Sequence, residues 1–250
     1  MRKQSIILLH GLFGGLSNWE GVIEHFGPTH DVHVPLLPIM DEHKENELEY
    51  FVNWLQKYID DAGLKDVILV GNSLGGHVAI LYAHRYQYNV RAIVLTGSSG
   101  LYEKTSLGSF PRRHSYSFIR KHVANTFYDP ATATDELVDE VFKIVGDNRK
   151  CLRIIRTSRR TQNTYVTDML PEIKLPVLLI WGREDNVTPP HVAGDFLRML
   201  PNAKLVFLEK CGHAPMMERP KEFNEIFEDF LDEVCCPQEG RINENVNKAS

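Results

Sequence analysis

The 250-residue sequence has no long hydrophobic run and no strong excess of charge of one sign. No segment approaches the roughly 20 apolar residues of a membrane-spanning helix. The apolar run at residues 6–9 is too short for the core of a secretion signal. A net charge of −5, with 43% hydrophobic and 24% charged residues, is unlike that of a nucleic-acid-binding protein or a disordered chain. We therefore expect a soluble globular protein with no membrane or nucleic-acid partner.

Cysteine is also scarce, with four residues that show no metal-binding spacing: Cys151, Cys211, Cys235 and Cys236. Two of them are adjacent near the end of the last expected helix, and none forms a CxxC pair. This usage is typical of a protein in a reducing cytoplasm rather than of a disulfide scaffold. It predicts a cytoplasmic protein without a metal centre.

Short apolar, β-branched runs alternate with helical patterns, which is typical of a parallel sheet covered by helices. The expected strands are residues 5–9, 32–36, 67–71, 92–96, 177–181 and 204–208. The expected helices are residues 19–26, 45–62, 74–86, 190–200 and 220–234.

The stretch from about residue 100 to 171 breaks this alternation, with helix-like pieces at 135–145 and 149–159 but no buried strand. We therefore expect an α/β core at residues 1–99 and 172–236, with residues 100–171 as a helical cap, or lid. Residues 237–250 are polar enough to form a disordered tail.

Charge is unevenly distributed, because residues 101–170 carry 12 Lys and Arg against 8 Asp and Glu, whereas the remainder has a net charge of −9. Six basic residues recur at helical spacing in this segment: Arg149, Lys150, Arg153, Arg156, Arg159 and Arg160. Such runs are usually solvated helix faces. The alternative is that one arginine faces the pocket and favours an anionic substrate.

The most informative motif is VILVGNSLGG at residues 67–76, where a strand-like run meets GxSxG and opens into a helix. A serine raised at so sharp a turn brings the residues two before and two after it together, and only small residues fit there. Gly71 and Gly75 flank Ser73 in this way. The pattern alone arises by chance in about one chain in ten of this length, so its partners decide its meaning.

Two downstream loops supply those partners, since a serine hydroxyl needs a neighbouring base and a carboxylate that orients the base. Glu184 and Asp185 follow one expected strand and His213 follows the next. The carboxyl ends of parallel strands meet at one sheet edge, where ligands bind. Ser73, Asp185 and His213 are therefore expected to meet there.

With these motifs in register from residue 5 to residue 234, the chain resembles the α/β-hydrolase superfamily, whose catalytic residues follow in the order Ser, Asp, His. The resemblance implies a mostly parallel sheet of about six strands, with Ser73 as nucleophile and His213 as general base and then acid. It also implies Asp185 as the orienting carboxylate, with Glu184 as its rival. No cofactor is implied.

The oxyanion hole is expected from the backbone N–H of Leu74, at a helix N-terminus beside the nucleophile. By resemblance, the second donor is the N–H of Leu12 in the HGLFGG loop, with Phe13 as the alternative. His10 is expected to shape this loop, and His77 to be packed rather than catalytic.

Apolar candidates for the substrate pocket are Phe13, Phe110, Phe118, Met216 and Met217, each of which could equally belong to the core. Of these, Phe13 and Met216 are our preferred substrate-binding residues.

Two departures from the family pattern stand out. Too few residues precede residue 5 for the antiparallel hairpin that usually begins the sheet. In addition, PLLPIMD at residues 35–41 replaces a Gly-rich loop. Neither change removes a catalytic residue.

The expected reaction is hydrolysis of a small carboxylic ester or thioester through an acyl-enzyme. GNSLGG resembles the nucleophile segment of the meta-cleavage-product hydrolases, which break C–C bonds in dienoic acids and use a cap arginine, so C–C hydrolysis is the alternative. The loop LFGG at residues 12–15 is closer to that of simple carboxylesterases. Ser73 excludes the nucleophilic aspartate of haloalkane dehalogenases. A slow or inactive ligand-binding sensor on the same fold is the alternative from another class.

Overall fold

The structure is a computed structural model that describes residues 3–103 and 112–235. Within these residues six parallel strands form one sheet in the order β2-β1-β3-β4-β5-β6. The strands are β1 (Ser5–Leu9), β2 (Asp31–His33), β3 (Val67–Asn72), β4 (Val90–Thr96), β5 (Val177–Gly182) and β6 (Ala203–Leu208). The predicted six-stranded parallel sheet is confirmed. Strands β1, β3 and β5 are buried along their whole length because helices cover both faces of the sheet.

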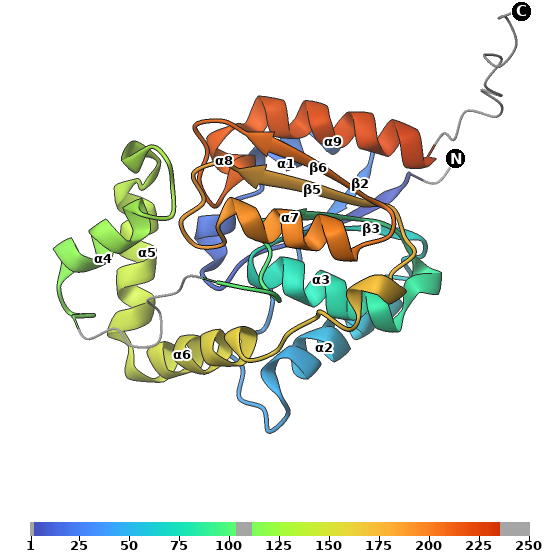
Figure 1. Ribbon diagram of the computed structural model, residues 1–250. Helices are drawn as coiled ribbons and strands as arrows, with labels where there is room; N and C mark the ends of the chain where they lie inside the picture. The colour runs from blue at the N-terminus through green and yellow to red at the C-terminus, as the bar shows by residue number, and fades with distance from the viewer. Residues whose placement is uncertain (1–2, 104–111, 236–250) are drawn as a thin grey trace, which may run out of the picture.

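Helices cover the two faces of the sheet (Figure 1). Their bounds are α1 (Glu20–Phe26), α2 (Glu47–Asp61), α3 (Leu74–Arg85), α7 (Pro190–Met199), α8 (Pro215–Glu218) and α9 (Pro220–Cys235). In Figure 1, α1 and α9 lie above the sheet, while α2, α3 and α7 lie below it.

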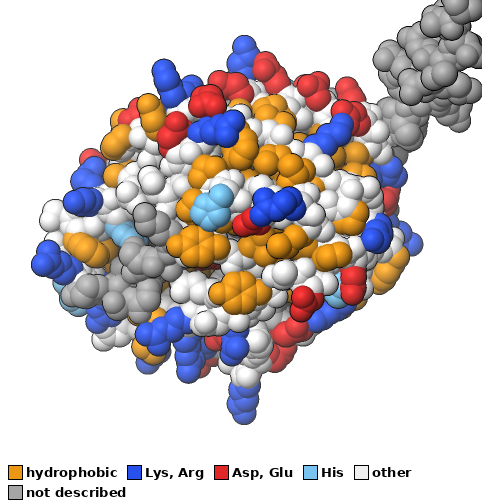
Figure 2. Space-filling view, in the orientation of Figure 1, with side chains coloured by type: hydrophobic (Ala, Val, Ile, Leu, Met, Phe, Trp, Pro, Cys, Tyr) orange, Lys and Arg blue, Asp and Glu red, His pale blue; other side chains and the backbone are white. Residues whose placement is uncertain are grey.

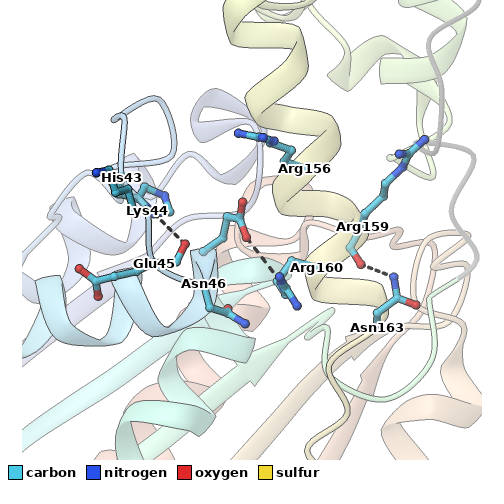
Figure 3. Close-up of a pocket in the computed structure, with 9 residues that line it drawn as sticks. His43, Lys44, Glu45, Asn46, Arg156, Arg159, Arg160 and Asn163 are labelled. Atoms are coloured by element: carbon cyan, nitrogen blue, oxygen red, sulfur yellow. Dashed lines mark hydrogen bonds and ion pairs between the residues drawn. The ribbon is translucent and has the colours of Figure 1, made fainter.

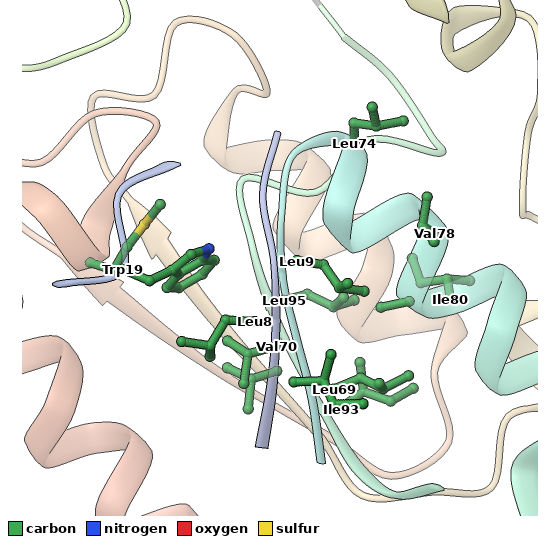
Figure 4. Close-up of a cluster of buried hydrophobic side chains, with 14 of the residues drawn as sticks. Leu8, Leu9, Trp19, Leu69, Val70, Leu74, Val78, Ile80, Ile93 and Leu95 are labelled. Carbon is green, nitrogen blue, oxygen red and sulfur yellow. The ribbon is translucent and has the colours of Figure 1, made fainter. Parts of the chain in front are cut away.

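The core lies between the sheet and these helices (Figure 4). Successive strand residues point to opposite faces: Leu9 is directed toward α3, whereas Leu8 points toward Trp19 on the other side. Both leucines are fully buried, and Trp19 is 2% exposed. This two-sided packing fixes β1 and β3, and with them the loops that follow.

Among the described residues between β4 and β5 there are three α-helices: α4 (Tyr116–Ala124), α5 (Asp135–Gly146) and α6 (Asn148–Gln162). Asp147 caps α6, because its Oδ1 accepts hydrogen bonds from the N–H groups of Arg149 (2.8 Å) and Lys150 (3.0 Å). Helix α6 packs against α2, and α5 packs against the short 3-10 turn Gly14–Ser17 after β1. The insertion thus contacts the core near the strand ends. Its treatment as a separate cap stays a prediction.

Some expectations were wrong in detail. Strand β2 ends at His33 rather than residue 36, because Pro35 lacks a backbone N–H and Leu36 is 74% exposed. Helices α4 and α8 were not predicted.

Phe110 and the expected disordered tail at residues 237–250 lie outside the described residues. None of the described helices has the length and apolar character needed to cross a membrane.

Candidate active site

Ser73 lies at the turn between β3 and α3 in a backbone conformation that residues other than glycine rarely adopt, with φ 54° and ψ −118°. Such a backbone costs on the order of 1–3 kcal/mol and persists only where the surroundings enforce it. A Cβ on Gly71 would lie 2.5 Å from the carbonyl carbon of Gly75, and a Cβ on Gly75 would collide with the carbonyl oxygen of Leu9. Both glycines are therefore required, and Ser73 remains partly exposed at the sheet edge.

The backbone around Ser73 is held by three hydrogen bonds. Its N–H donates to the carbonyl of Thr96 (3.1 Å), and its carbonyl accepts from the N–H groups of His77 (3.2 Å) and Ser99 (3.1 Å). Leu74 is the first residue of α3, so its N–H has no acceptor within the helix and is available to a ligand. This geometry suits the oxyanion role predicted for Leu74.

The loop after β1 passes directly beside Ser73. A Cβ on Gly11 would lie 2.9 Å from Ser17 Oγ and 3.3 Å from the Ser73 Cβ, so a larger residue here would crowd both serines. Leu12 follows in this loop and is half-buried, whereas Phe13 is 6% exposed. The proximity agrees with Leu12 as the second oxyanion donor, a role that stays a prediction.

His213 and Asp185 form a buried pair beside this turn, with 2.9 Å between His213 Nδ1 and Asp185 Oδ2. The second oxygen, Oδ1, accepts from the N–H groups of Val187 (2.8 Å) and Thr188 (2.9 Å). The Thr188 hydroxyl donates to Oδ2 (2.8 Å). Four donors therefore stabilise the ionised carboxylate and fix its orientation toward the imidazole.

Of the two acidic candidates, only Asp185 contacts His213. Glu184 Oε2 instead accepts a hydrogen bond from the N–H of Cys211 at 2.9 Å. Because Nδ1 of His213 is engaged by Asp185, Nε2 is the ring nitrogen available for proton transfer.

The environment makes His213 a stronger base. Burial lowers its pKa, but the charge and hydrogen bond of Asp185, with smaller contributions from Glu103 and Glu218, outweigh burial and raise the pKa above its ordinary value. Gly97 lies against the ring, and its φ of +53° together with a Cβ that would come within 2.7 Å of Nδ1 excludes larger residues.

Asn72 connects the loop after β1, the end of β4 and the loop after β6. The sequence analysis missed this role. Its Nδ2 donates to the carbonyls of Thr96 (3.0 Å) and His213 (2.9 Å). Its Oδ1 accepts from the Ser17 hydroxyl (2.6 Å), which in turn accepts from the N–H of Gly11 (2.8 Å). The sequence did contain a signal for this role, because Asn72 is a polar residue that directly follows an apolar strand run and precedes Ser73.

His10 holds the loop after β1, in agreement with the sequence interpretation. The N–H of Leu37 donates to His10 Nε2 (2.9 Å), so Nδ1 carries the proton and donates to the carbonyl of Gly11 (2.7 Å). Burial is the main cause of the lowered pKa of His10, which favours this neutral tautomer.

His77 is fully buried one turn after Ser73, and neither ring nitrogen has a hydrogen-bond partner among the described residues. Burial lowers the pKa of His77 to about 3. It is therefore neutral and packed, as the sequence interpretation expects.

His77 is expected to make the fold sensitive to acid. Between pH 6.5 and about 3 the unfolded chain binds a proton at this residue and the folded chain does not, so stability falls as pH decreases through this window. The loss totals on the order of 4–5 kcal/mol. Urea unfolding at pH 7, 5 and 4 measures it. His77→Leu should flatten the profile, whereas replacement of the exposed His114 by Gln should not. An equal acid sensitivity in wild type and His77→Leu would refute this explanation.

The predicted pocket residues are placed differently from one another. Phe13 and Met216 are buried in the hydrophobic core cluster, 6% and 2% exposed, and Met217 packs against it. Phe118 lines a groove beside α4 with Lys121 and His122 rather than the triad. Substrate binding by Phe13 and Met216 therefore stays a prediction.

Arg156, Arg159 and Arg160 of α6 line a separate groove of about 600 Å³ between this helix and residues 43–47 (Figure 3). Arg160 forms an ion pair with Glu47 at 3.5 Å, and Arg156 points toward the loop that carries Lys44. Figure 2 shows basic side chains gathered at the lower edge of the molecule, over α6. Neither Ser73 nor its partners line this groove, and Arg156, Arg159 and Arg160 are exposed, so these three arginines belong to the solvated face that the sequence first suggested, whereas Arg153 is half-buried.

Comparison with known proteins identifies the family of this chain. The model of the alpha/beta hydrolase family matches residues 6–226, and the chain belongs to this family. A curated relative from Cupriavidus pinatubonensis, a 2-hydroxy-6-oxononadienedioate/2-hydroxy-6-oxononatrienedioate hydrolase, is 27% identical over 252 residues, covering 91% of this chain and 86% of its own.

Solved structures give the same family. MGS-MChE2, an alpha/beta hydrolase enzyme from a sediment metagenome of the Mar Chica lagoon, is 37% identical with a TM-score of 0.75, covering 93% of this chain and 92% of its own. The meta-cleavage product hydrolase CumD of Pseudomonas fluorescens IP01 has a TM-score of 0.81 at 23% identity, covering 93% and 92%. The latter likeness concerns the fold alone.

Proposed function

We propose that this hydrolase uses Ser73 as a nucleophile, His213 as general base and then general acid, and Asp185 as the carboxylate that orients the imidazole. The observation that carries the proposal is the buried 2.9 Å contact between His213 Nδ1 and Asp185 Oδ2, on the loops next to the strained Ser73 turn. A packing histidine would not need a buried carboxylate held by three further donors.

The reaction follows from these positions. Ser73 Oγ bonds to the substrate carbonyl carbon while its proton passes to His213 Nε2. The negative oxygen that forms accepts hydrogen bonds from the N–H groups of Leu74 and Leu12. His213 returns the proton to the leaving group, and water, deprotonated by His213, then releases the acid from Ser73. His213 transfers the proton in each of these steps, and none of them requires a cofactor.

Two bond types fit this machinery. The activities named for the curated relatives support C–C hydrolysis of a 2-hydroxy-6-oxo-dienoate, and they support it better than our preferred sequence interpretation of a carboxylic ester or thioester. Arg153 is compatible with an anionic substrate, since its Nη1 is buried without a partner among the described residues. Ester hydrolysis stays a candidate because acyl transfer to serine needs only the residues above.

A substrate panel separates these candidates. Purified protein is incubated with 2-hydroxy-6-oxo-6-phenylhexa-2,4-dienoate, followed by its loss of colour, and with short ethyl esters and acyl thioesters, followed by acid and thiol release. Higher kcat/KM for the dienoate than for every ester would establish C–C hydrolysis, and the reverse order would establish an esterase or thioesterase. Turnover of none, with tight binding of one compound, would overturn the proposal in favour of a ligand-binding protein.

A further inference from the structure

Glu103 is a second acidic residue close to the triad. It lies in the loop that follows β4, and the Ser99 hydroxyl donates a hydrogen bond to its carboxyl group. The N–H of Ser99 itself donates to the carbonyl of Ser73 (3.1 Å). Gly97, two residues before Ser99, lies against the His213 ring. The loop that carries Glu103 is thus attached to both Ser73 and His213.

One carboxylate oxygen of Glu103 forms no hydrogen bond with the described protein. Oε1 is shielded from solvent and has no hydrogen-bond partner. A buried polar atom left in this way costs about 1–3 kcal/mol or more, so its retention requires an explanation. The other buried acids of the site differ, since Asp185 receives four donors and Glu184 receives the N–H of Cys211.

The charges around Glu103 belong to the site. It interacts electrostatically with His213, which favours its ionised form, and with Asp185, which disfavours it. Burial has the largest effect, and the pKa of Glu103 is raised above its ordinary value. When Glu103 is ionised, its Oε1 therefore receives no hydrogen bond from the described protein. A bound molecule can supply the missing donor.

We propose that Glu103 is a specificity-determining residue whose Oε1 accepts a hydrogen bond from a hydroxyl or ammonium group of the substrate and keeps carboxylates away from that position. The inference rests on the proposed function, because it places the substrate over Ser73. A site with a buried acceptor rejects analogues that cannot donate to it. Like charges in such a site also repel each other strongly.

Alkyl fluorophosphonates test this without knowledge of the natural substrate, because they phosphonylate an activated serine directly. Three series share the same chain lengths and end in methyl, hydroxyl or carboxylate groups. At pH 8, wild type should react about tenfold faster with the best hydroxyl probe than with its carboxylate partner. Glu103→Gln should reduce this ratio about tenfold when each rate is divided by the methyl-probe rate of the same variant. Glu209→Gln, which removes an exposed carboxylate, should leave the ratio unchanged.

The pH dependence of the same reaction gives a second readout. The acidic groups that act on His213 are Asp185, Glu103 and Glu218. Loss of the Glu103 charge should move the acid limb of the labelling rate to lower pH, which a purely structural role would not do. Equal probe ratios in wild type and Glu103→Gln would overturn the inference alone, whatever the pH profile shows. No reaction of Ser73 with any probe would overturn the proposed function and the inference together.

Discussion

Replacement of Ser73 by alanine is expected to lower kcat by on the order of 10⁵- to 10⁶-fold, the scale seen when a catalytic serine is removed. No described residue other than Ser73 combines a hydroxyl group with the strained backbone of the turn between β3 and α3. Alanine fits the same backbone, so the fold should persist. The measurement is kcat on whichever substrate the panel identifies, with the melting temperature as a check of folding.

Ser98→Ala is the matched control for this loss. Ser98 is buried near the same turn, and its hydroxyl donates to the carbonyl of Ser99 (2.9 Å). Loss of that hydrogen bond should cost about 1 kcal/mol of stability and less than about threefold in kcat. Comparable activity in Ser73→Ala and Ser98→Ala would show that Ser73 is not the nucleophile.

Asp185→Asn should reduce kcat about 10⁴-fold, as expected when the orienting carboxylate of a triad is made neutral. The geometry leaves no good position for the amide. If its oxygen faces His213, its NH₂ group meets the N–H donors of Val187 and Thr188. If its NH₂ group faces His213, the ring must carry its proton on Nε2, where it cannot accept the proton of Ser73.

Glu184→Gln separates this effect from general loss of charge. Its side-chain oxygen can still accept from the N–H of Cys211, so kcat should change less than about threefold. Steady-state kinetics of both variants decide the assignment. A larger loss in Glu184→Gln than in Asp185→Asn would assign the orienting role to the rival acid.

Much of the sheet could be predicted from the sequence because its signals are local. Residues 6–9 of β1 and 67–70 of β3 are continuous apolar runs, and the latter run is followed by Gly71 and Gly75, the glycines that a sharp turn requires. The pairing of Asp185 with His213 could be expected because β5 and β6 are adjacent parallel strands whose following loops share one edge. Strand β2 was predicted too long because apolar residues around Pro35 imitate a strand.

Contacts between distant residues could not be predicted in this way. Asn72 bonds to the carbonyl of His213, 141 residues away, and no periodicity reports such a contact. Glu103 resembles any loop acid in the sequence, and only its burial beside Ser99 distinguishes it. The spacing of the arginines in α6 predicts a helix but not which face meets the site, and the structure directs Arg156 and Arg160 to a separate groove.

Identification of the residue modified by an ethyl fluorophosphonate tests the central claim most directly. Wild-type protein and Ser73→Ala are treated at pH 8, digested and analysed by mass spectrometry. We expect one phosphonyl group on the peptide that contains Ser73, complete loss of hydrolysis in step with labelling, and no labelling of Ser73→Ala. Modification of a different residue, or hydrolysis that continues after Ser73 is fully modified, would contradict the account.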